Sequence, residues 1–124
     1  MKNVLIVDDS SVMRKIIERC LRQAGVNLSK VHEANDGYEG LSVLQANPVD
    51  LILCDINMPT MDGLEFLQAL ATSDEARRIP VVMITTEGSE DRVYEALSNG
   101  ARGYIRKPFT AEQLKEQVGP LLEA

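Results

Sequence analysis

The sequence predicts an α/β fold in which a strand and a helix alternate five times, (βα)5, with the strands forming one doubly wound parallel sheet. Short apolar runs recur along the 124 residues, and each is followed by a stretch whose apolar side chains recur every three or four positions. The runs are continuously apolar, which is typical of parallel strands covered by helices on both faces. Right-handed crossovers leave few topologies for such a sheet.

The expected strands are short. They lie at residues 4–7, 31–34, 51–54, 81–84 and 103–105. Helical spacing follows each strand, in the sets Val12, Ile16, Cys20 and Ala24; Leu41 and Leu44; Leu64 and Leu67; Val93 and Leu97; and Leu114, Val118 and Leu121. These side chains are expected to form the apolar faces of the helices.

Polar residues and glycines mark the expected helix ends. Residues 36–39, 62–65 and 110–113 have capping-box spacing, with Asp or Thr three positions before Glu or Gln. Gly25 and Gly100 suit the left-handed position that follows a helix. Because proline inside a helix costs about 3 kcal/mol or more, the last helix is expected to end or kink at residues 119–120.

Composition indicates one soluble, cytoplasmic domain over residues 1–124, with about two-thirds of the unfolded surface buried on folding. No apolar run approaches the roughly 20 residues of a membrane helix, and the first residues do not form a signal peptide, so no membrane insertion is expected. The net charge of −6 disfavours direct binding to nucleic acid. Cys20 and Cys54 lack metal-ligand spacing and are expected to be buried, reduced thiols.

Polar residues follow four of the expected strands. In a parallel sheet the carboxyl ends of the strands share one edge, where ligands bind. Each residue has a plain structural role open to it, as a helix cap, a strand-end residue or an exposed cation, but their shared edge favours one common site. The residues are Asp8 and Asp9 after the first strand, Asp55 after the third, Thr85 and Thr86 at the fourth, and Lys107 and Pro108 after the fifth.

Three carboxylates at one edge require a cation, because at about 5 Å and an effective dielectric constant near 20 each pair repels by roughly 3 kcal/mol. Lys107 is one candidate, and a divalent ion is the more complete one. Oxygen ligands without His or Cys suit Mg²⁺, whereas Ca²⁺ is disfavoured because the sequence has no calcium-binding loop motif. Mg²⁺ beside a carboxylate, a hydroxyl and a lysine suits phosphoryl transfer.

The segments VLIVDDSSVMR, LILCDINMPTMDG, VVMITTEG and GYIRKPF resemble, in order, the four motifs of the receiver domains of two-component response regulators. The resemblance covers essentially the whole chain and is greatest to the stand-alone chemotaxis type. It implies a flavodoxin-like sheet with strand order 2-1-3-4-5. It also implies that Asp55 accepts a phosphoryl group from a kinase phosphohistidine or a small phosphodonor, and that the chain is a switch rather than a turnover enzyme.

The resemblance also implies how the metal is held. Asp9 and Asp55 would ligate Mg²⁺ directly, together with the main-chain carbonyl of Asn57, and Asp8 would act through water. The cofactor expected for the protein is therefore Mg²⁺.

Further roles are implied for the phosphoryl group and the switch. Thr85 and Lys107 match the residues that bind phosphoryl oxygens, and the peptide bond between Lys107 and Pro108 is expected to be cis. Tyr104 matches the aromatic switch residue, which turns inward when Thr85 moves toward the phosphoryl group. The surface that carries the message is expected on the fourth helix, the fifth strand and the fifth helix.

Three positions are expected to tune how long the phosphoryl group lasts. Thr86 stands where receivers most often have alanine or glycine, so its larger side chain is expected to slow phosphorylation or hydrolysis. Asn57 and Glu87 occupy the two variable positions that tune the attacking water. Their identity matches the chemotaxis type, which implies a short-lived phosphoryl state.

The implied phosphodonor is a CheA-like sensor histidine kinase. The implied target is a downstream protein such as the flagellar motor switch, and a phosphatase is a further implied partner. The chain itself is expected to be a monomer. A phosphorelay shuttle and the receiver fragment of a longer regulator are alternatives. A haloacid-dehalogenase-type phosphatase would need a second acid where Asn57 stands. A flavodoxin-like nucleotide-binding module would need Ser, Thr and Gly where Asp8 and Asp9 repel phosphate.

Overall fold

The computed structural model describes residues 1–86 and 89–122 and contains one parallel sheet of five strands. The order of the strands is β2-β1-β3-β4-β5, and each neighbouring pair is parallel. The predicted (βα)5 fold and its strand order are confirmed. The strands are β1 (Lys2–Val7), β2 (Leu28–Ala34), β3 (Leu51–Cys54), β4 (Val81–Thr85) and β5 (Gly103–Arg106).

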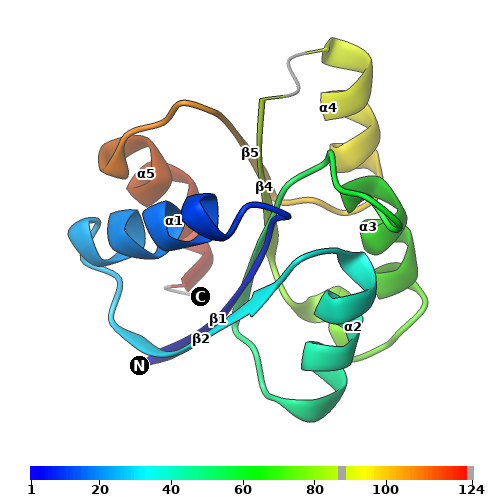
Figure 1. Ribbon diagram of the computed structural model, residues 1–124, viewed down its shortest axis with the longest axis horizontal. Helices are drawn as coiled ribbons and strands as arrows, with labels where there is room; N and C mark the ends of the chain where they lie inside the picture. Colours follow the sequence, from blue (N-terminus) through cyan, green and yellow to red (C-terminus); the bar gives the residue numbers. More distant parts are fainter. Residues whose placement is uncertain (87–88, 123–124) are drawn as a thin grey trace.

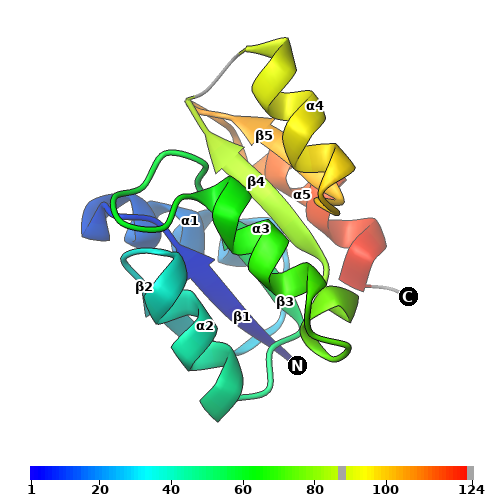
Figure 2. The ribbon, with the colours of Figure 1, turned by 90° about the vertical axis from the view of Figure 1, so that its right-hand side faces the viewer.

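Helices cover both faces of the sheet, as Figures 1 and 2 show. Helices α1 and α5 lie together on one face, and α2, α3 and α4 lie on the other. None of the helices in the described ranges is long and apolar enough to cross a membrane. The helices are α1 (Ser11–Gln23), α2 (Gly37–Ala46), α3 (Gly63–Ala71), α4 (Glu90–Ser98) and α5 (Ala111–Leu122), with a short 3-10 helix, η1 (Ala76–Arg78), before β4.

The sheet separates two apolar cores. Ile17 of α1 and Leu114 of α5 belong to the first, and Phe66 of α3 belongs to the second. The central strands β3 and β4 are buried along their whole length, whereas the edge strands β2 and β5 contain half-buried and exposed residues. Cys54 on β3 is buried as predicted, but Cys20 is only half-buried; both are free thiols.

Helix α1 presents to the sheet a different apolar stripe from the one that its spacing suggested. Val12 and Ile16 are 68% and 39% exposed, whereas Ile17 is 2% exposed. Two apolar stripes run side by side along this helix, and spacing alone does not select between them. Helix α4 shows the same shift by one position, because Leu97 is exposed and Ala96 is buried.

The last helix was expected to end or kink at residues 119–120; α5 does not end there, because it continues to Leu122 with Pro120 inside it. Leu121 and Leu122 pack against the core between the sheet and α1. We attribute the extra turn to this burial, which offsets the hydrogen bond that a proline removes.

The predicted helix starts are confirmed in two cases and half formed in the third. The capping boxes at 62–65 and 110–113 are complete, with both reciprocal hydrogen bonds present. At the start of α2 the Asp36 carboxylate accepts the Glu39 N–H, but the Glu39 carboxylate accepts from the Asn35 side chain instead of the cap. Asn35 directly precedes the N-cap residue Asp36, and its side-chain amide donates to the Glu39 carboxylate at 3.0 Å.

Two glycines lie just after helices, as predicted. Gly25 follows α1 with φ of 85°, and Gly100 follows α4 with φ of 108°. A side chain at such a φ costs roughly 1–2 kcal/mol, so glycine is favoured where the chain turns from these helices toward β2 and β5.

Candidate functional site

Ionic residues extend the sheet by one position beyond β1, β3 and β5. The N–H of Asp8 donates to a carbonyl of β2 at 3.0 Å, and the N–H of Asp55 donates to a carbonyl of β1 at 2.9 Å. The N–H of Lys107 donates to the Thr85 carbonyl at 2.9 Å. These bonds fix the backbone at three neighbouring points of one sheet edge, so the side chains project from a rigid base.

Three carboxylates meet at this edge. Oxygens of Asp8, Asp9 and Asp55 lie within 4.8 Å of one another. Asp8 and Asp55 are 2% and 8% exposed, whereas Asp9 is exposed. The Oδ1 atoms of Asp8 and Asp55 accept the N–H groups of Ser10 at 2.9 Å and Asn57 at 3.3 Å. Each buried carboxylate is therefore oriented by the turn that follows it.

Lys107 bridges the two buried carboxylates. Its Nζ lies 2.8 Å from Asp8 Oδ2 and 3.2 Å from Asp55 Oδ2, and its side chain is 10% exposed. Burial by itself lowers the pKa of this ammonium, but the hydrogen bond that it donates to Asp8 and the charges of both carboxylates outweigh burial, so the pKa of Lys107 is raised. The side chain is therefore held as a cation inside the cluster.

The donor set fits a hard divalent ion. Three carboxylates face one ammonium, so the cluster retains negative charge that a metal can balance. All candidate ligand atoms are oxygens, and oxygen sets of this kind suit Mg²⁺. Asp9 lies on the exposed side, where an ion that keeps several waters can enter.

Close backbone packing supports Asp55 from behind. A Cβ on Gly63, the first residue of α3, would lie 2.3 Å from the Asp55 carbonyl oxygen and 2.8 Å from the Ile56 Cα. The Gly63 N–H donates to the Ile56 carbonyl at 2.8 Å. Cys54 Sγ donates to the Asp55 carbonyl at 3.2 Å, and burial raises the pKa of this thiol well above its ordinary value. The segment that begins at Asp55 is thus packed directly on the first residue of α3.

The other predicted site residues lie on the neighbouring strands. Thr85 ends β4 and is fully buried, and Thr86 follows it and is exposed. The peptide bond between Lys107 and Pro108 is cis. Glu87 lies outside the described residues.

Tyr104 on β5 is half-buried and lines an open groove of about 540 Å³ between α4 and β5. Tyr94 and Leu97 of α4 are 75% and 46% exposed along this groove. Acidic and basic side chains share its rim. The remaining lining residues are Glu90, Asp91, Val93 and Arg106.

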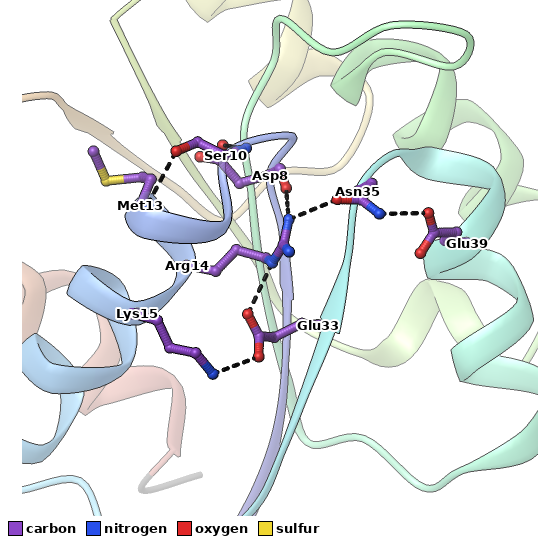
Figure 3. A network of polar contacts seen from close by, with 8 residues as sticks. All are labelled: Asp8, Ser10, Met13, Arg14, Lys15, Glu33, Asn35 and Glu39. Atoms are coloured by element: carbon purple, nitrogen blue, oxygen red, sulfur yellow. Dashed lines mark hydrogen bonds and ion pairs between the residues drawn. The ribbon is translucent and has the colours of Figure 1, made fainter.

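A second polar network supports the turn of residues 8–10 after β1, here called the acidic loop, from the side of α1 (Figure 3). The Arg14 guanidinium donates to the main-chain carbonyl of Asp8, to the Glu33 carboxylate and to the Asn35 side chain. Lys15 Nζ also lies 2.8 Å from the Glu33 carboxylate. Hydrogen bonds from Lys15 and Arg14 lower the pKa of Glu33.

With this fold and site, the chain belongs to the family of response regulator receiver domains, whose pattern matches residues 4–119. It is 41% identical over 120 residues to the chemotaxis protein CheY-3 of Vibrio cholerae, covering 97% of this chain and 91% of that protein. It is 40% identical to the chemotaxis protein CheY of Pseudomonas aeruginosa, covering 97% of this chain and 95% of that one.

Solved structures agree with this assignment. The chemotaxis protein CheY4 of Vibrio cholerae is 36% identical, with a TM-score of 0.86 over 98% of both chains. A putative response regulator from Chloroflexus aurantiacus is 28% identical, with a TM-score of 0.89 over 99% of this chain and 98% of that chain. The flavodoxin-like, CheY-like fold and the link to two-component signalling are thus established.

Two contacts at the site were not predicted from the sequence. The sequence indicates Gly63 only as part of the capping box at residues 62–65, although glycine is also the residue that permits close backbone approach. Arg14 was not singled out, because its partners lie 6, 19 and 21 positions away along the chain and no local pattern joins them.

Proposed function

We propose that this protein is a phosphorylation-controlled switch of a chemotaxis-type two-component system, with Asp55 as the phosphoacceptor. The observation that carries the proposal is the ammonium of Lys107 between the carboxylates of Asp8 and Asp55. The Lys107 ammonium already contacts the Asp55 carboxylate, so it can neutralise the negative charge of a phosphoryl group that is transferred to Asp55. The relatives named as chemotaxis proteins support the choice of signalling system.

In the reaction, a carboxylate oxygen of Asp55 attacks the phosphorus of a phosphohistidine on a partner kinase, or of a small phosphodonor. A bond between oxygen and phosphorus forms, the bond between phosphorus and the donor breaks, and the donor keeps the electron pair. Water later cleaves the aspartyl phosphate to the carboxylate and inorganic phosphate. The chain therefore returns to its starting state and is a switch, not a turnover enzyme.

Mg²⁺ held by Asp9, Asp55 and the Asn57 carbonyl, with Asp8 acting through water, would supply charge neutralisation for the phosphoryl oxygens. Lys107 offers its ammonium to the same oxygens, within reach of the Asp55 carboxylate that it already contacts. Thr85, buried at the end of β4, offers a hydroxyl to them.

The switch couples this site to the groove between α4 and β5. Movement of Thr85 toward the phosphoryl group opens space into which Tyr104, half-buried on β5, turns inward. Shifting such a surface from 1:99 to 99:1 takes about 5.5 kcal/mol of preference for one state. The face formed by α4, β5 and α5 then binds a downstream protein, with the flagellar motor switch as the proposed target and a phosphatase as a further partner.

The lifetime of the phosphoryl group is set by Asn57, Thr86 and Glu87. Thr86 follows Thr85 and is exposed, and its branched side chain is proposed to slow the access of attacking water and of the phosphodonor. A phosphorelay shuttle uses the same chemistry and differs in its partner, which is then another phosphotransfer protein.

Intact-mass measurement after incubation with acetyl phosphate and Mg²⁺ tests the proposal. One phosphoryl adduct is expected, absent without Mg²⁺ and absent in Asp55→Asn, which keeps the shape of the side chain. Labelling of Asp55→Asn equal to the parent would disprove the assignment. Sustained hydrolysis of many equivalents of a small phosphoester would instead indicate a phosphatase.

A further inference from the structure

The Arg14 side chain ties the acidic loop to two other elements. One nitrogen, Nη1, donates both to the Asp8 carbonyl, at the end of β1, and to Asn35 Oδ1, in the loop before α2, at 2.9 Å. The Nε donates to Glu33 Oε1 on β2 at 2.8 Å. Figure 3 shows the guanidinium lying between these three acceptors. The Arg14 side chain is 11% exposed, and its bonds to Asp8 and Glu33 are partly shielded from water, whereas the bond to Asn35 lies at the surface.

The Asp8 carbonyl belongs to the peptide plane that joins Asp8 to Asp9. The other groups of Asp8 are held from elsewhere, because its N–H bonds to β2 and its carboxylate bonds to Ser10 and Lys107. Within residues 1–86 and 89–122, no hydrogen bond or ion pair reaches the Asp9 carboxylate. The position of Asp9 therefore depends on the orientation of this peptide plane, and Arg14 is the side chain that fixes it.

We propose that Arg14 is a positioning residue for the magnesium site, acting by holding the Asp8–Asp9 peptide plane so that the Asp9 carboxylate faces Asp55. The inference rests on the proposed function, since it presumes that these carboxylates bind Mg²⁺. Arginine suits the role because its planar fork directs donors to several acceptors at once, whereas a lysine ammonium has one nitrogen.

The positioning role and the charge of Arg14 predict opposite changes in Mg²⁺ affinity when a neutral residue replaces it. Arg14 is a cation beside an acidic cluster, so its charge alone repels Mg²⁺, and a neutral replacement would tighten binding. Loss of positioning weakens binding in any replacement that lacks the fork, including lysine, which keeps the charge. Groups that orient metal ligands typically change metal affinity about tenfold or more when removed.

The experiment is a Mg²⁺ titration of the folded, ¹⁵N-labelled protein followed through the backbone amide shifts of residues 8–10 and 55–57. For Arg14→Lys and Arg14→Gln the midpoint is expected to rise about tenfold, the lower end for orienting groups. Arg22→Gln is the matched control, because Arg22 lies on the same helix and pairs with Glu18 at 3.2 Å without contacting the loop. Its midpoint is expected to equal that of the parent.

An Arg14→Lys midpoint within twofold of the parent, or tighter binding in Arg14→Gln, would overturn the inference. Failure of the parent to bind Mg²⁺ would instead overturn the proposed function. The melting temperature of each variant is recorded alongside, because a purely structural role would lower it without moving the midpoint. Should both Arg14 variants fail to fold, the neutral change Asn35→Ala is expected to raise the midpoint by less than about tenfold, because Arg14 keeps its bonds to Asp8 and Glu33, and an unchanged midpoint would count against the proposal.

Discussion

The acidic edge of the sheet, where Asp8, Asp9 and Asp55 meet, and the exposed face of α4 differ in how they are held. At the acidic edge, main-chain bonds to neighbouring strands hold Asp8 and Asp55, and both side chains are almost fully buried. On α4, Ala96 is the buried residue, and Tyr94 and Leu97 stand largely exposed along the groove. The site proposed for phosphoryl chemistry, which needs fixed distances, thus has its backbone bonded to neighbouring strands. The surface proposed for partners has one buried residue on α4, and we expect it to move at a lower free-energy cost.

The largest effect should come from Gly63→Ala, which attacks the rigid base. The new methyl would lie 2.3 Å from the Asp55 carbonyl oxygen, and the atoms it meets include backbone that cannot move aside easily. We expect a loss of about 3 kcal/mol in the free energy of unfolding, measured in urea. Gly119→Ala is the control, since a Cβ there meets nothing within 4 Å, and it should stabilise α5 by up to about 1 kcal/mol. Equal stability of Gly63→Ala and the parent would show that the backbone around Asp55 adjusts easily to the added methyl group.

Lys107→Met removes the cation from the centre of the acidic edge. Asp8 and Asp55 then face each other without the ammonium that lies 2.8 Å and 3.2 Å from them. We expect a loss of about 2 kcal/mol in Mg²⁺-free buffer, less than for a fully buried pair because water reaches the neighbouring Asp9. Added Mg²⁺ should restore more stability to this variant than to the parent.

Lys115→Met, at an exposed lysine of α5, is the control for that change and should alter stability by less than about 0.5 kcal/mol. Similar losses in both lysine variants would mean that the cluster does not depend on its internal cation. If added Mg²⁺ raised the free energy of unfolding equally in the parent and in Lys107→Met, the same conclusion would follow.

The sequence predicts the scaffold of both regions better than their surfaces. Apolar runs and polar strand ends located Asp8, Asp55 and Lys107, because in a parallel sheet one topological rule brings all strand ends together. The sequence did not show which of the two apolar stripes of α1 faces the sheet, because packing decides that Ile17 is buried and Ile16 is not. The contacts of Arg14 were missed for a related reason, as they join three elements distant along the chain.

Glu33→Gln tests the outer support of the acidic edge through pH. Hydrogen bonds from Lys15 and then Arg14 lower the pKa of Glu33 in the folded state. A lowered folded-state pKa stabilises the protein above the unfolded value, about 4.3, and this contribution disappears as pH falls through the folded value. The parent should exceed Glu33→Gln by less than about 1 kcal/mol at neutral pH, because the carboxylate is partly exposed, and the gap should close below about pH 4. Urea unfolding of both proteins from pH 7 to pH 3 measures it, and a gap that widens on acidification would contradict this assignment.

The smallest effect is expected from Leu97→Ser on α4. Its side chain is 46% exposed, so little apolar area is lost, and the free energy of unfolding should change by less than about 0.5 kcal/mol. Adduct formation with excess acetyl phosphate should still reach one phosphoryl group per chain, because the residues proposed to carry the chemistry are unchanged and Leu97 lines the groove instead of the acidic edge. Ala96→Val, one position earlier and buried, should cost about 1–3 kcal/mol by overpacking. If Leu97→Ser lowered the free energy of unfolding as much as Ala96→Val, α4 would be as tightly packed as the acidic edge. The surface that moves on switching would then have to lie elsewhere on the molecule.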